Sequence, residues 1–239
     1  MTPQPVDELV PPVAHDPVPD LVEKILGVSD YVSPAYWLGW VAEQATGTNP
    51  WQWIADQYAG DWQAVQKAGK ALENLGEFNT GYGVALRTGM STLSGTWDGK
   101  AAGSASTYFT TLGDAVESQA PDLKAMGQEL ITMATGMYET ANAISGLFAT
   151  LLDLLIAAAA EAAATAATSW TGVGLVAGGA ALALTLAKAT SVWRAVLDAH
   201  SAAWIACQGL VGVMAGYLGG LHDLDVHALP SAAYDHPGV

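Results

Sequence analysis

The chain has 239 residues, enough for one domain with a substantial apolar core or for one domain with an appendage. Its 8 Lys and Arg against 23 Asp and Glu give a formal net charge of -15, which repels phosphate backbones and anionic lipid headgroups and argues against nucleic acid as a partner. A single cysteine, Cys207, excludes an internal disulfide, and in its apolar surroundings we expect a small buried side chain.

Residues 1–20 hold six of the 11 prolines and several acidic side chains, with little apolar surface to bury. Because proline lacks an amide hydrogen and fixes its backbone angle, we predict an extended, disordered arm. The first residues lack the basic start, apolar stretch and cleavage site of a secretory signal, so export by the general signal-peptide route is not expected.

Residues 21–50 are predicted to form a short helical preface. We expect one helix at about residues 20–27. Ser33-Pro34 and Asn49-Pro50 are each typical of a helix start, with a capping side chain before a proline at the first helical position.

From Trp51 onward, apolar side chains recur at spacings of three, four and seven, which predicts a long amphipathic helix. They are Trp51, Ile54, Tyr58, Val65, Leu72, Leu75, Tyr82, Leu86 and Leu93. Several glycines lie in the same stretch, where they weaken the helix or let another backbone come close. They are Gly69, Gly76, Gly81, Gly83 and Gly89.

Gly95 and Trp97-Asp98-Gly99 predict a break, after which a second apolar stripe runs on for about fifty residues from Ala105 to Leu154. The matching arms predict an all-α fold, with a long antiparallel helical hairpin over residues 51–168 that turns at Trp97-Asp98-Gly99. Pro121 predicts a kink or a fresh helix start in the second arm. Two ordinary core helices of a compact bundle are the alternative.

Two long amphipathic arms joined at Trp97-Asp98-Gly99, in an acidic chain rich in Ala and Gly, resemble the WXG (early-secreted-antigen-like) family of actinobacterial type VII secretion. Trp97 and Gly99 match its Trp-x-Gly turn. The phrases at residues 25–34, 59–62 and 234–239 are similar to a larger single-chain branch of that family. The resemblance implies a secreted, non-enzymatic helical protein that acts through helix–helix contacts.

One feature departs from that family, whose members or their partners carry a Tyr-x-x-x-Asp/Glu export signal. The residue four positions after each tyrosine here is never acidic. Those residues are Ala35, Trp40, Trp62, Leu86, Leu112, Asn142, Leu221 and Gly238. Either a co-folded partner supplies the signal or this chain is not itself a substrate and stays in the cytoplasm.

Residues 169–221 are predicted to form an apolar, Gly/Ala-rich helical hairpin, followed by a flexible tail at residues 222–239. Two uncharged stretches, 170–187 and 202–221, have lengths that reach a bilayer-spanning size. Small residues at spacings of four, which let helices approach closely, occur in both: Gly174, Gly178, Gly212, Gly216 and Gly220. We favour a hairpin buried in water-soluble form. Membrane insertion is the alternative.

No arrangement in the sequence provides reaction chemistry. His222, Asp223, Asp225 and His227 match no common ligand spacing and are better explained as a solvated turn. We therefore expect no catalytic residue, metal, cofactor or small-molecule substrate. The favoured function is a type VII secretion-associated protein that binds a helical partner or itself, and the alternatives are a membrane-active protein and a cytosolic chaperone for a co-encoded toxin.

Overall fold

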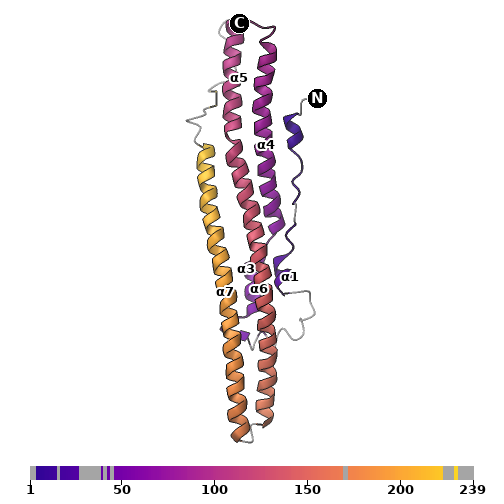
Figure 1. The fold of residues 1–239 in the computed structure, drawn as a ribbon, viewed down its shortest axis with the longest axis vertical. Helices are drawn as coiled ribbons and strands as arrows, with labels where there is room; N and C mark the ends of the chain where they lie inside the picture. The colour runs from indigo at the N-terminus through magenta and orange to yellow at the C-terminus, as the bar shows by residue number, and fades with distance from the viewer. Residues whose placement is uncertain are drawn as a thin grey trace. The chain divides into compact units, whose positions relative to one another are not determined.

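The computed structural model describes residues 4–14, 17–26, 39, 42–43, 46–168, 172–222 and 229–230. Within these ranges every regular element is a helix, which confirms the predicted all-α class. In chain order the elements are η1 (Pro5–Glu8), α1 (Leu21–Leu26), α3 (Pro50–Tyr58), α4 (Trp62–Leu93), α5 (Lys100–Ser118), α6 (Ala120–Thr168) and α7 (Gly172–His222) (Figure 1).

Helix boundaries follow local chemistry. Asn49 caps α3 by accepting from the amides of Trp51 and Gln52 at 3.1 and 3.3 Å. Gly60, with a φ of 153°, separates α3 from α4, so the apolar stripe that begins at Trp51 spans two helices. Near Pro121, α5 ends at Ser118 and α6 begins at Ala120, which is the fresh start predicted there.

The chain divides into two compact units, and α6 and α7 each run through both. Unit 1 comprises Met1–Pro17, Gln63–Ala134 and Gln208–Val239, and unit 2 comprises Val18–Trp62 and Thr135–Cys207. The segment boundaries proposed from the sequence stay a prediction, as does the mobility of the first twenty residues. Within unit 1, Pro5 of η1 lies against Gly81, and the carbonyl of Val10 accepts a hydrogen bond from Asn74 at 3.2 Å.

Unit 2 has an aliphatic and aromatic core. Trp51 of α3 contacts Phe148 of α6 edge to face at 5.3 Å, and Trp53 contacts Trp193 of α7 in the same way at 5.3 Å. Large, fully buried side chains come from α1, α3, α6 and α7: Leu21, Ile54, Tyr58, Ile144, Leu151, Leu155 and Val196. These side chains pack α1 and α3 against the later part of α6 and against α7 around Trp193 and Val196.

The C-terminal helical hairpin is formed by different segments from those predicted. Residues 172–222 form one continuous helix, α7, so a hairpin within residues 169–221 is wrong in that detail. The polar segment Lys188–His200 contains no Gly or Pro, and it buries Ala189, Trp193 and Val196 at helical spacing, so nothing interrupts the helix there. The hairpin is formed instead by α6, which continues through its alanine run, and α7.

Some predictions lie outside the described residues. These are the helix start at Ser33-Pro34, the solvated turn beyond His222, and the tail at residues 223–228 and 231–239.

Candidate helix-recognition site

In unit 1, α4 approaches α5 and α6 along glycines spaced seven residues apart. A Cβ atom at Gly69 would lie 2.5 Å from the carbonyl oxygen of Gly127, and one at Gly83 would lie 2.8 Å from that of Gly113. Both distances are too short for any side chain, so only glycine permits the backbones to come this close. We call this line the glycine seam. Its facing pairs are Gly69–Gly127, Gly76–Ala120 and Gly83–Gly113.

The glycine seam also fixes the register of the hairpin. In each facing pair the two residues are equally far along the chain from Asp98. An antiparallel hairpin whose pairs share one midpoint turns at that midpoint. The register therefore places the turn at Trp97-Asp98-Gly99, as the sequence predicts.

The side chains that α4 buries are not the apolar stripe from which the hairpin was predicted. Apart from Met90, its buried residues are small or polar: Gln66, Gly69, Asn74, Gly76, Asn79 and Gly83. Asn79 donates to Gln119 across the two arms at 3.5 Å. By contrast, Leu75 and Tyr82 are each 37 % exposed. The close approach of the backbones selects small side chains, which leaves the large apolar ones outside the seam.

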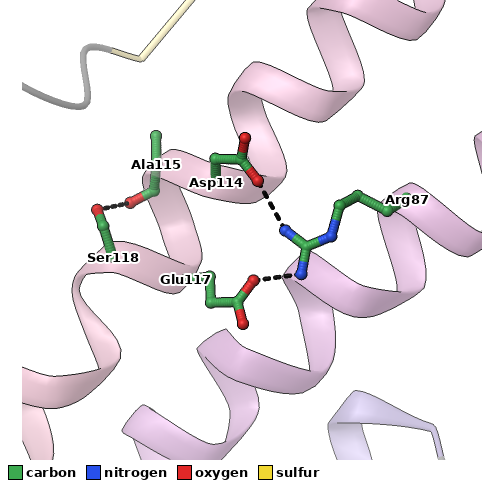
Figure 2. Close-up of polar contacts among 5 residues, drawn as sticks. All are labelled: Arg87, Asp114, Ala115, Glu117 and Ser118. Atoms are coloured by element: carbon green, nitrogen blue, oxygen red, sulfur yellow. Dashed lines mark hydrogen bonds and ion pairs between the residues drawn. The ribbon is translucent and has the colours of Figure 1, made fainter.

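An ion-pair cluster around Arg87 bridges the arms beside the seam, in addition to the pair of Glu77 and Lys124. Arg87 of α4 donates to Asp114 at 2.8 Å and to Glu117, both on α5, as Figure 2 shows. The hydrogen bond to Glu117 is the main cause that raises the pKa of Arg87. Because all three side chains are partly exposed, the cluster adds little stability and serves mainly to align the arms.

The turn explains why a glycine ends the motif. Its backbone continues α4 for one turn, since the Trp97 amide donates to the Leu93 carbonyl at 2.9 Å. Gly99, with a φ of 96°, then reverses the chain before α5, a conformation that other residues adopt only with strain. Trp97 remains 37 % exposed, and Asp98 is exposed. Trp97 therefore offers an apolar surface at the tip of the hairpin.

Two of the predicted helix-packing glycines lie near the start of α7. A Cβ atom at Gly178 would collide with Thr165 of α6, so this glycine does permit a close helix approach in unit 2. Deeper in the same hairpin, Thr185 donates to Glu161 at 3.0 Å. Gly174 lies in α7, but its surroundings are outside the described part of the chain.

The other three lie near the end of α7. A Cβ atom at Gly220 would lie 2.7 Å from Oδ2 of Asp122. Gly212 and Gly216 have open space where a Cβ would stand. The predicted spacing Gly212–Gly216–Gly220 is thus present on one helix, but only its last member meets a neighbouring side chain.

Sequence reasoning missed an aromatic cluster in unit 2. The Tyr58 hydroxyl lies 3.2 Å from Nδ1 of His200, and the rings of Trp53 and Trp204 contact the imidazole. Burial raises the pKa of Tyr58, as does nearby Cys207 to a lesser degree, and burial lowers the pKa of His200. The helical spacing of Trp193, His200 and Trp204 was the only available signal, because the facing residues are far away in sequence.

Two segments, Lys100–Thr168 and Val176–Leu221, include windows long and apolar enough to cross a membrane, judged by length and composition alone. Of the apolar window in the first segment 28 % is buried, and of that in the second segment 6 % is buried. Among the residues the structure describes, no three His, Cys, Asp or Glu side chains are grouped closely enough to hold a metal ion.

No family model matches the chain, and comparison with curated proteins and with solved structures finds no similar protein. The resemblance to the WXG family therefore depends on Trp97, Gly99 and the two arms, and it stays a hypothesis.

Proposed function

We propose that this chain is a non-enzymatic helix-recognition protein associated with type VII secretion, acting as a secreted substrate or as the partner or delivery module of one. The observation that carries the proposal is the apolar surface that α4 leaves uncovered. Because the hairpin closes largely through glycines, three large apolar side chains of α4 stay exposed and are available for another helix. We call Leu75, Tyr82 and Leu93 the α4 stripe.

The α4 stripe has the geometry of a helix-binding surface. Leu75 and Tyr82 are seven residues apart, and Leu93 follows eleven residues later, so all three lie on one side of α4. Tyr82 is stacked on Phe78 at 5.7 Å, which holds its ring in place. Burying each large apolar side chain in full contributes about 1.5 to 3 kcal/mol, and a partner helix with its own apolar face would cover several at once.

The proposed link to secretion has a specific requirement. Since no Tyr-x-x-x-Asp/Glu is present in the sequence, a co-folded partner bound at the α4 stripe would supply the export signal. In this scheme the chain is carried out of the cell with its partner. A chaperone that stays in the cytoplasm is the alternative.

Export can be measured directly in the producing bacterium. The protein should appear in culture filtrate, and deleting the secretion ATPase should remove it from the filtrate while leaving the cellular amount unchanged. Removing the α4 stripe with Leu75→Ser and Tyr82→Ser should also prevent export. Finding the protein only in the cytoplasm, in equal amounts with and without the ATPase, would contradict the secretion part of the proposal and favour the chaperone.

A second candidate function is membrane insertion by the end of the α6–α7 hairpin. Residues 162–187 carry no charged side chain, and Val176 and Leu184 in this stretch are exposed. The test is flotation of the full chain with phosphatidylcholine vesicles and release of a trapped dye. A monodisperse protein that neither floats nor releases dye at neutral and acid pH would exclude this function.

A further inference from the structure

Glu161 of α6 lies in the least charged part of the chain. Between Asp153 and Lys188 it is the only charged side chain, and it separates the uncharged residues 162–187 from a second uncharged stretch at residues 154–160. All of these residues belong to unit 2. A single carboxylate therefore interrupts an otherwise uncharged end of the α6–α7 hairpin.

The carboxylate of Glu161 is turned toward α7, and only one of its oxygens has a hydrogen-bond donor. Oε1 accepts from the hydroxyl of Thr185 at 3.0 Å. Oε2 is buried, and among the residues the structure describes no donor reaches it. A buried charged oxygen without a donor costs free energy, because it has lost water and gained no replacement. The charge is thus tolerated between α6 and α7 rather than stabilised there.

The hairpin beyond Glu161 exposes an apolar surface on nearly every side. Over residues 162–168 and 176–187, whose exposure the structure describes, no side chain is buried. At 100° per residue, the exposed positions cover at least about 200° of the circumference of each helix. A protein partner covers one face of a hairpin, whereas lipid surrounds it. Apolar residues all round a helix therefore favour lipid as the partner of this end.

The position of Glu161 divides the hairpin by depth. From residue 162 to its end at Thr168, α6 is about 10 Å long at 1.5 Å per residue. Measured from residue 154, the same arm is about 22 Å long, and the uncharged residues 172–187 of α7 extend for about 24 Å. Half of the hydrocarbon core of a bilayer is about 15 Å thick, which lies between these lengths.

We propose that the charge of Glu161 limits how deeply the end of the α6–α7 hairpin enters a phosphatidylcholine bilayer. The inference rests on the second candidate function, membrane insertion, and names the residue that controls it. Hydrocarbon excludes a carboxylate, so the charged hairpin stops with Glu161 at the edge of the core and stays in one leaflet. Without this charge both arms pass the midplane. A zwitterionic lipid is specified because a net charge of -15 repels anionic headgroups.

The test places an environment-sensitive fluorophore on either side of Glu161. In a Cys207→Ala background, Ala164→Cys carries nitrobenzoxadiazole beyond the carboxylate and Ala157→Cys carries it before the carboxylate, both at exposed positions. With phosphatidylcholine vesicles, the label at residue 164 should brighten, and a lipid spin-labelled in its acyl chain should quench it, whether residue 161 is Glu or Gln. The label at residue 157 should respond in this way only with Glu161→Gln.

Two further variants separate the charge of Glu161 from other effects. Glu161→Gln keeps an oxygen that accepts from Thr185, and Glu161→Asp, which keeps the charge, should behave as the wild type. Asp153→Asn removes an equal charge at an exposed residue outside the uncharged segment and should also behave as the wild type. Release of a trapped dye should be at least about tenfold faster with Glu161→Gln than with these two variants. Circular dichroism and light scattering without vesicles should be the same for all.

The outcomes distinguish the proposal from the function on which it rests. A label at residue 157 that enters the bilayer equally in the wild type and in Glu161→Gln would overturn the proposal and leave membrane insertion in place. A label at residue 164 that stays in water in both proteins would overturn membrane insertion and the proposal together. Equal gains in dye release from Glu161→Gln and Asp153→Asn would assign the effect to overall charge and would also overturn the proposal.

Discussion

At the scale of single residues, Gly99 has the clearest role. Its positive φ closes the turn, and no neighbouring atom limits the space for a side chain there. The glycine of Trp97-Asp98-Gly99 is thus explained by backbone conformation. The role of Trp97 does not follow from the turn itself, because its ring is partly exposed. We propose that this ring contacts a partner.

Gly99→Ala should lower the free energy of unfolding by about 1 to 3 kcal/mol, since alanine is strained at a φ of 96° and a ψ of -172°. Gly103→Ala is the control, because Gly103 lies within α5 with open space around it. It should stabilise the protein by up to about 1 kcal/mol through its better helix propensity. Urea titration of both variants measures the difference, and equal effects would show that the turn does not need glycine.

His200 should make stability depend on pH. Burial lowers its pKa in the folded state below the ordinary value of 6.5, so the unfolded chain binds more protons near and below that pH. The neutral His200 side chain therefore contributes its full share to stability above about pH 6.5. That contribution decreases as the pH falls from the pKa of the unfolded state to the lower pKa of the folded state.

Replacing His200 with Asn, which can still bind the Tyr58 hydroxyl, should remove this contribution. As the pH falls from 8 to 5, the wild type should lose more unfolding free energy than His200→Asn does. A difference that is constant over this range would contradict the assignment.

At the scale of helices, the sequence was sufficient to predict that a hairpin forms and where it turns. It was not sufficient to predict which face closes it. The periodicity of Leu75, Tyr82 and Leu93 indicated a buried stripe, but backbones in close contact bury glycine and polar side chains instead. The seven-residue spacing of Gly69, Gly76 and Gly83 held the missing information.

The glycine seam leads to a test on matched sites of α4. Gly69→Ala places a methyl group 2.5 Å from the Gly127 carbonyl and should cost about 1 to 3 kcal/mol, because the backbones must move apart. Gly89→Ala has open space and should be neutral or stabilising. Thermal unfolding of both variants would decide the matter: a Gly69→Ala protein as stable as Gly89→Ala would show that the helices are not in close contact.

At the scale of the whole molecule, contacts between segments far apart in the sequence were the part that could not be predicted. The all-α class, the start at Asn49-Pro50 and the new helix near Pro121 all follow from local signals. The continuity of α7 also had a local signal in the buried spacing of Ala189, Trp193 and Val196, but composition suggested a break. The aromatic cluster around His200 could not be predicted, because α3 and α7 contribute to it from distant parts of the chain.

The central claim is that the α4 stripe binds a helical partner. The most direct measurement is purification of the tagged full chain from the producing bacterium, with quantification of any protein that copurifies in equal amount. We predict that a helical protein copurifies with the wild type and with Val84→Ser, which removes an exposed apolar side chain from the opposite side of α4. It should be lost from Leu75→Ser/Tyr82→Ser. Equal recovery with that double variant, or no such protein with the wild type, would contradict the claim.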